Sequence, residues 1–397
     1  MNDQVAVPSI ALPNRVSFFD RRSDFRRLVF RGALLEFVTV GFYRFWLATD
    51  IRRHLWSHTS VEGDAPEYTG TAKELFLGFL FALAILAPIY LVYFVIGLEA
   101  ERWKAFASTP LAIFFYVFFQ FAIYRARRYR LTRTVWRGVR FWMGGSGLSY
   151  AWRVALWSLF ASITLGIALP WRQAALERFK MKYTSYGDLA GRFVATGGAL
   201  FKRGWLLWLV TAVMAVFLFV AASMQLGGLI AAAFGLEALI LPFIYGAYKA
   251  IEWRWWVSGV RFGDVSFESD LRRGAMIGLY WRVIGWMILV TIVMTIWVSA
   301  VLGIGYVLTD FNGPAAQKLA FVSQQLPVLI GYGAGYVAML LVISMVMRIY
   351  LIHDVWKRVA ESVTVHNVVA AHNVTTQGSP VGALGEGFAG SLDVVGF

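Results

Sequence analysis

Six apolar stretches, each long enough to cross a lipid bilayer, recur along the chain with basic, Trp- and Tyr-rich segments between them. A membrane span needs about 20 mainly apolar residues. The stretches pair as three helical hairpins: 75–98 with 111–124, 205–233 with 239–251, and 283–308 with 319–347. They predict an all-α polytopic membrane protein with about six transmembrane helices.

The composition supports a membrane protein, because 59% of the residues are hydrophobic and only 15% are charged. Soluble domains are closer to half apolar and a quarter charged. The net charge of +14 would suit nucleic acid, but the cations flank apolar spans. Positive-inside retention and attraction to anionic headgroups explain them more simply, so we expect membrane lipids and no nucleic acid as partners.

Two further apolar stretches, 32–46 and 154–171, are harder to place. Residues 125–153 contain eight arginines and no acidic residue, and residues 172–203 are also basic. A single crossing by 154–171 would put one basic segment outside, against the positive-inside tendency, and the same holds for 32–46. We therefore expect two re-entrant or interfacial helices that break near Gly41 and Gly166, with both termini cytoplasmic.

An internal duplication is suggested by self-similarity. Residues 38–46 align with 163–171 at an offset of 125, which also carries Arg53 onto Arg178 and Thr59 onto Thr184. The alternative is chance similarity between membrane margins rich in Trp and Arg. The predicted organisation has five parts: a polar N-terminal segment (1–27), repeat unit 1 (28–148), repeat unit 2 (149–270), a partial third unit forming a helical hairpin (271–365) and a flexible C-terminal tail (366–397).

Three segments of the first unit carry a family resemblance: GFYRFW at 41–46, RRHLWSHT at 52–59 and YTGTAKELFLGF at 68–79. They resemble the signature of the YjgN-like family of bacterial inner-membrane proteins, and the resemblance extends over roughly 28–365. It implies location and fold. Because the family has no established activity, it implies no catalytic residues. Its members are often encoded beside a membrane zinc metalloprotease, which implies such a protease as a partner, with self-association as another option.

The basic margins supply candidate residues for binding lipid or a partner. The 3–4–3 spacing of four arginines predicts one stripe on an amphipathic helix at headgroup level. Simple topology retention and interfacial anchoring are the alternative. The candidates are Arg130, Arg133, Arg137, Arg140, Arg52, Arg53 and Trp56.

Short segments ending in Gly-Asp, at 59–64, 184–188 and 258–264, predict small cytoplasmic β-hairpins. The Gly-Asp pairs are typical of turns, and a cation site built from Asp64, Asp188 and Asp264 is the alternative.

His54 and His58 have the four-residue spacing of a two-histidine metal face. In a His-Glu-x-x-His motif the glutamate would directly follow the first histidine, but Leu55 stands there, followed by Trp56. We therefore interpret the two histidines as an interfacial pair beside Trp56. The sequence has no cysteine, so thiolate sites are excluded, and it predicts no metal site and no cofactor.

Candidates for a pore or a half-inserted helix are few. They are Glu36, Gly41, Gly166, Gly331 and Gly335. Gly331 and Gly335 form a Gly-x-x-x-Gly spacing that favours close helix contact, and a pore-lining filter is the sharper alternative.

No catalytic constellation is recognisable, so we expect a protein that is not an enzyme. A scaffold or lipid-associated envelope protein accounts for basic, aromatic margins around an uncharged interior. A transporter or channel built on the repeats is the alternative. Transport would require a polar path on which six side chains converge: Gln120, Thr211, Gln225, Thr291, Thr295 and Ser344.

Overall fold

Helices dominate the computed structural model, which describes residues 14–99, 109–225, 227–309 and 317–376. They follow one another as five helical hairpins. The first four are α1 (Arg22–Val38) with α2 (Arg44–Ser57), α3 (Ala72–Glu99) with α5 (Thr109–Thr132), α6 (Gly147–Ile163) with α7 (Leu169–Lys182), and α8 (Gly197–Ser223) with α9 (Gly227–Gly259). The fifth pairs α10 (Arg273–Thr309) with α11 (Gln317–Val346), which continues through the π-helix η2 (Met347–Asp354) into α12 (Val355–Glu361). A short 3-10 helix, η3 (Val368–Ala371), follows the last strand.

Short strands separate the hairpins. They are β1 (Asn14–Arg15), β2 (Ser17–Phe18), β3 (Thr59–Ser60), β4 (Glu67–Tyr68), β5 (Thr134–Trp136), β6 (Val139–Met143), β7 (Thr184–Tyr186), β8 (Leu189–Phe193), β9 (Val260–Phe262), β10 (Val265–Ser269) and β11 (Val363–His366). Nine of them form one antiparallel sheet in the order β1-β11-β10-β9-β8-β7-β6-β5-β4, and β2 pairs with β3.

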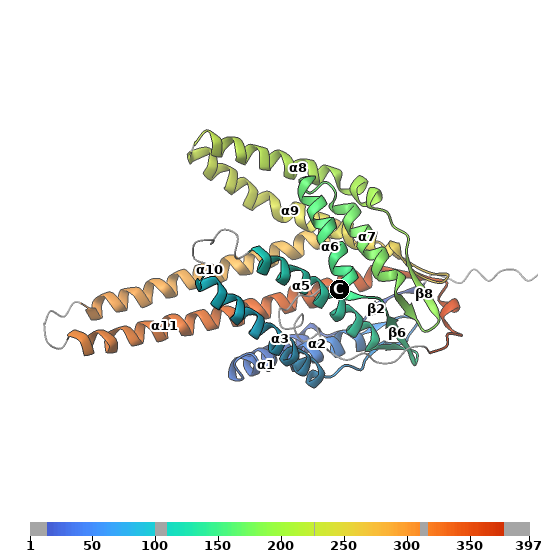
Figure 1. Ribbon diagram of the computed structural model, residues 1–397, viewed down its shortest axis with the longest axis horizontal. Coiled ribbons are helices and arrows are strands. Elements are labelled where there is room, and N and C mark those ends of the chain that lie inside the picture. Colours follow the sequence, from blue (N-terminus) through green and yellow to red (C-terminus); the bar gives the residue numbers. More distant parts are fainter. Residues whose placement is uncertain (1–13, 100–108, 226, 310–316, 377–397) are drawn as a thin grey trace, which may run out of the picture.

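The strand pairing closes every helical hairpin at its base. The strands that flank α1 and α2 pair with each other, with Phe18 opposite Thr59. The same holds for the other four hairpins, which are closed by β4–β5, β6–β7, β8–β9 and β10–β11. Four hairpins therefore leave the nine-stranded sheet and return to it, and the α1–α2 hairpin does the same at the β2–β3 pair. All described strands lie at one end of the molecule. Figure 1 shows the long hairpins pointing away from this end.

The prediction of six spanning helices is confirmed by length and composition. Six described helical segments are long and apolar enough to cross a bilayer: Ala72–Val95, Thr109–Thr132, Gly197–Ser223, Gly227–Gly259, Arg273–Leu302 and Val328–Glu361. Only 6–22% of their most apolar windows is buried inside the structure, so most of their apolar surface faces outwards. The four helices α1, α2, α6 and α7 are not among them.

The β structure differs from the sequence prediction. Separate small hairpins are expected from the Gly-Asp turns, whereas the structure joins successive hairpins edge to edge, as in Phe141 opposite Tyr186. An isolated two-stranded hairpin is marginally stable, and its edges carry unpaired N–H and C=O groups. Joining the hairpins satisfies these groups. The described chain is mostly helical, as predicted, and its β-hairpins are joined in one nine-stranded sheet.

Element boundaries in the first half of the chain recur 125 residues later. The pairs of first residues are Arg22 and Gly147, Arg44 and Leu169, Thr59 and Thr184, and Ala72 and Gly197. Gly41 and Gly166, also 125 apart, both have positive φ and lie in the turns between α1 and α2 and between α6 and α7. These two glycines break the short helices where the sequence predicts the break.

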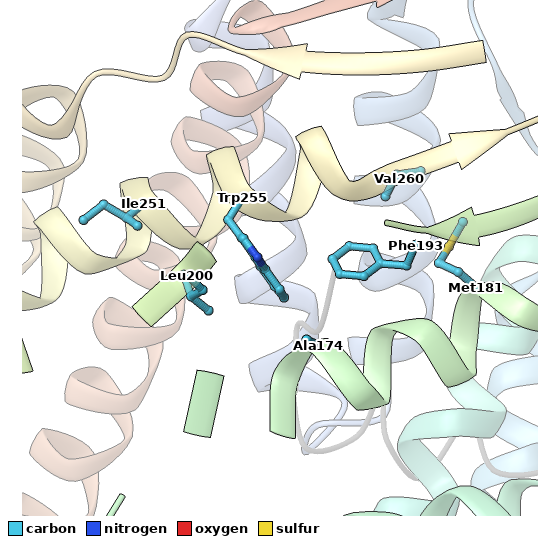
Figure 2. Packing of buried hydrophobic residues seen from close by; sticks show 7 residues of the cluster. All are labelled: Ala174, Met181, Phe193, Leu200, Ile251, Trp255 and Val260. Carbon is cyan, nitrogen blue, oxygen red and sulfur yellow. The ribbon is translucent and has the colours of Figure 1, made fainter. Parts of the chain in front are cut away.

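A packed core lies where the helix bases meet the sheet. In Figure 2, Trp255 of α9 points towards Phe193 of β8, and their ring centroids are 5.0 Å apart. The Trp255 indole nitrogen donates to the Thr196 carbonyl over 2.9 Å. Leu200 and Ala174 complete the contact between α8, α7 and α9. This core fixes the positions of the helix ends that line the cavity described next.

Candidate functional site

A cavity of about 490 Å³ lies among the helix ends near the sheet. Its walls come from α2, α5, α9 and the η2–α12 segment, with residues such as Thr134 and Val260 from the strands. These elements belong to four of the five hairpins, so the cavity exists only because the sheet gathers their bases together. Its volume lies in the range of ligand-binding pockets, roughly 300–1,000 Å³.

The cavity combines cations with an apolar, aromatic lining. Five arginines line it: Arg44, Arg52, Arg127, Arg130 and Arg348. Four tryptophans do so as well: Trp56, Trp253, Trp256 and Trp356. Aliphatic side chains such as Ile51 and Leu55 fill most of the rest, and among the described lining residues there is no carboxylate. Guanidinium groups among aromatic and aliphatic side chains match, in their chemistry, an anion attached to an apolar body.

Two of the arginines are held by carboxylates behind the wall. Arg127 lies 3.2 Å from Glu177, which also pairs with Lys180. Burial alone would raise the pKa of Glu177, but Lys180 and Arg127 lower it to about 2, so its carboxylate stays charged. Arg348, on η2, lies 2.8 Å from Glu36 on α1. These ion pairs fix the two guanidinium groups in position.

Hydrogen bonds orient the aromatic wall. The Trp56 and Trp356 rings stack with centroids 4.7 Å apart. Their indole nitrogens donate to the hydroxyls of Thr134 and Thr59 over 3.0 and 2.8 Å. With its N–H groups satisfied by strand residues, the tryptophan pair offers apolar ring surface to the cavity. Arg52 donates to the Tyr68 hydroxyl over 3.1 Å and lies over its ring.

Of the predicted lipid- or partner-binding residues, Arg52, Trp56 and Arg130 come together in this cavity. The adjacent Arg53 donates to the Gly70 carbonyl over 2.9 Å, and Arg133 pairs with Glu74 at 2.6 Å.

The predicted arginine stripe on one helix is wrong. Helix α5 ends at Thr132, and the chain turns at Arg137 and Gly138, both with positive φ, between β5 and β6. Arg137 pairs with Glu62 and with Asp64, at 3.0 and 2.6 Å. Arg140 donates to the Thr132 carbonyl over 2.7 Å. The same 3–4–3 spacing of arginines can run across the end of a helix and into a hairpin. Here the β-branched residues after Thr132 favour a strand, and Gly138 favours a turn.

Gly331 and Gly335 make the close contact between helices that their Gly-x-x-x-Gly spacing predicts. The Trp297 indole nitrogen of α10 donates to the Gly331 carbonyl of α11 over 2.9 Å. A Cβ added at Gly335 would clash with the Trp297 ring, and one at Gly331 would lie 3.2 Å from Val301. Both glycines therefore make room for α10, as Gly-x-x-x-Gly spacings do in membrane helices. Glu36, the remaining pore candidate, is the partner of Arg348.

A buried polar network, not predicted from the sequence, joins three distant segments. Asp20, before α1, lies 3.0 Å from His54 Nε2 on α2 and 2.5 Å from His353 Nε2 on η2. His353 Nδ1 lies 2.9 Å from Asp354, which pairs with Arg22 at 2.8 Å. The Asp20 carboxylate is fully buried.

Burial and hydrogen bonding fix the charge states in this network. Burial alone would raise the pKa of Asp20, but the hydrogen bonds from His353 and His54 outweigh it, and the net pKa lies below the usual value. Burial lowers the pKa of His54 despite its hydrogen bond to Asp20. Asp20 is therefore a carboxylate and His54 a neutral imidazole at neutral pH.

Six described helices are long and apolar enough to cross a membrane, and the strands gather at one end of them. These features define a multi-pass membrane protein. The chain belongs to the family described as bacterial protein of unknown function (DUF898), whose model matches residues 13–390 and which includes the YjgN-like proteins that the sequence resembles. Comparison with curated proteins and with solved structures gives no match.

Proposed function

We propose that this is a non-enzymatic, lipid-associated protein of the bacterial inner membrane that holds an anionic amphiphile in the arginine- and tryptophan-lined cavity. The observation that carries the proposal is the lining itself, which contains five arginines and four tryptophans and, among its described residues, no carboxylate. Guanidinium groups bind phosphate through paired, charge-assisted hydrogen bonds. Tryptophan faces and aliphatic walls suit an acyl chain or another apolar body.

The orientation follows from the strand pairing and the positive-inside rule. All five helical hairpins start and end at a strand pair, four of them in the nine-stranded sheet and α1–α2 at the β2–β3 pair. The basic segments connect these bases, and basic loops are retained on the cytoplasmic side. We place the sheet, both ends of the described chain and the cavity in the cytoplasm at the headgroup level. The short hairpins α1–α2 and α6–α7 then enter the membrane and return on the cytoplasmic side, and the 125-residue recurrence supports a duplicated unit.

Transport has less support. Three of the polar span residues, Thr211, Thr291 and Thr295, donate to carbonyls of their own helices, over 2.9 Å each. Hydroxyls bonded in this way are satisfied inside a membrane without a water-filled path.

Removing two cavity arginines should release the lipid. We expect the Arg52→Gln/Arg130→Gln variant to lose at least about 10-fold in affinity for phosphatidylglycerol, because hydrogen bonds to charged groups contribute roughly 1.5–3 kcal/mol each. The measurement is native mass spectrometry of the detergent-solubilised protein titrated with phosphatidylglycerol and, separately, with phosphatidylcholine. The wild-type protein is expected to prefer the anionic lipid.

The matched control removes two exposed cations outside the cavity, with Arg192→Gln/Arg273→Gln. It changes the net charge equally and should leave the lipid affinity within a factor of two. Equal losses in both double variants would mean that general electrostatic attraction binds the lipid. No preference of the wild-type protein for the anionic lipid would overturn the proposal.

A further inference from the structure

Two residues of the buried network, Asp20 and His54, lie close to a third possible metal ligand, His58. Asp20, His54 and His58 each offer a ligand atom, and these atoms lie within 4.8 Å of one another. The His54 and His58 rings stack with centroids 4.1 Å apart, as their four-residue spacing on α2 allows. Two ligands of a tetrahedral zinc ion are about 3.3 Å apart. The 3.0 Å between His54 Nε2 and Asp20 Oδ1 is already close to this separation.

Outer hydrogen bonds prepare the ligands. His58 Nδ1 lies 2.7 Å from the backbone carbonyl of His54, which can only accept, so Nδ1 carries the proton and Nε2 keeps its lone pair. The second oxygen of Asp20 is held by His353, whose other nitrogen faces Asp354. In protein metal sites, hydrogen bonds to neighbouring groups orient the ligands. A ligand imidazole typically bonds to a carbonyl or carboxylate, and a ligand carboxylate bonds to a further side chain.

We propose that Asp20, His54 and His58 form a binding site for a divalent transition metal ion, with zinc as the best match. Two imidazoles and one carboxylate form a ligand set that binds zinc in other proteins, and a water molecule would supply the fourth ligand. Because His54 is a neutral imidazole, its Nε2 can bind the ion in the tautomer that carries the proton on Nδ1, and the ion then takes the place of the hydrogen bond between His54 and Asp20. The half-buried His58 gives the ion access from the solvent side, whereas the Asp20 side chain is fully buried.

A metal here would join parts of the chain that are far apart. Asp20 precedes α1, the histidines end α2, and His353 extends the network to the π-helix η2. The ion would tie the N-terminal segment to α2 beside the cavity wall at Trp56.

The test uses the full-length protein purified with a tag that contains no histidine. After EDTA treatment and its removal, zinc is titrated against a chromophoric competitor, and cobalt is added to a parallel sample. We expect one zinc per chain and the visible absorption of tetrahedral cobalt. His58→Gln should weaken zinc binding by about 100-fold or more and abolish the cobalt spectrum, because a ligand costs more than the 10–100-fold of an outer contact.

Matched controls keep the result interpretable. His372→Gln removes an exposed histidine elsewhere in the protein and should bind zinc like the wild-type chain. In EDTA, His58→Gln should unfold at the wild-type temperature, which shows that it folds. In zinc, only the wild-type protein and His372→Gln should gain thermal stability. Wild-type affinity in His58→Gln, or no stoichiometric binding to the wild-type chain, would overturn the proposal.

Discussion

Glutamine in place of Glu36 is expected to lower the free energy of unfolding by about 3 kcal/mol, because it removes a carboxylate with which a buried arginine pairs. Arg348 is only 5% exposed and Glu36 18% exposed, and they join α1 to η2 across 312 positions of the chain. The measurement is reversible unfolding in detergent, followed by tryptophan fluorescence. If Glu36 served a pore instead, Glu36→Gln would leave the stability unchanged.

A double-mutant cycle separates the ion pair from other effects. Arg348→Met with Glu36→Gln should recover much of the stability that Glu36→Gln loses, because the buried guanidinium group that paired with Glu36 is removed as well. The surface control is Asp270→Asn, which breaks the pair with Arg15 between side chains 67% and 63% exposed. Exposed pairs contribute about 0–1 kcal/mol, so this variant should stay near the wild-type stability. A loss in Asp270→Asn equal to that in Glu36→Gln would contradict the account.

Alanine at Gly246 should force α9 away from α10. A methyl group at this buried position would lie 2.7 Å from the Ile277 Cα and 3.0 Å from its backbone nitrogen, so no side-chain rotation relieves the clash. Overpacking of this kind costs about 1–3 kcal/mol, even though alanine favours a helix over glycine. We expect a lower thermal unfolding midpoint in detergent.

Gly235, on the same helix, provides the control. It is exposed, and a Cβ there meets nothing within 4 Å. Gly235→Ala should therefore be neutral or slightly stabilising through helix propensity. A Gly246→Ala variant as stable as Gly235→Ala would mean that α9 and α10 do not pack as described.

The spanning helices could be predicted because each is a local run of apolar residues. The breaks at Gly41 and Gly166 could be predicted because glycine readily adopts the positive φ that both positions have. The continuous sheet could not, because its pairings join short strands across whole helical hairpins, as in Asn14 opposite Val365. Local patterns contain no information about such contacts. The same limit made Arg137 look helical, since spacing alone does not show where a helix ends.

The candidate sites were predictable only in part. Arg52, Trp56 and Arg130 stand out as basic and aromatic margin residues, but nothing local brings Trp253 or Arg348 to the same cavity. His54 and His58 have metal-like spacing, yet the carboxylate beside His54 is Asp20, 34 positions earlier in the chain. Long-range contacts, not residue types, were the missing information.

The most direct test of the account asks whether all hairpin bases lie on one side of the membrane. Because the chain has no cysteine, single cysteines can be placed at exposed turn residues of the sheet, Asp188→Cys and Asp264→Cys, and at Thr109→Cys, where α5 begins. Intact spheroplasts are treated with a membrane-impermeant maleimide. We expect labelling at position 109 alone in intact spheroplasts, and at 188 and 264 only after the membrane is permeabilised. Labelling of one sheet turn but not the other in intact spheroplasts would contradict it.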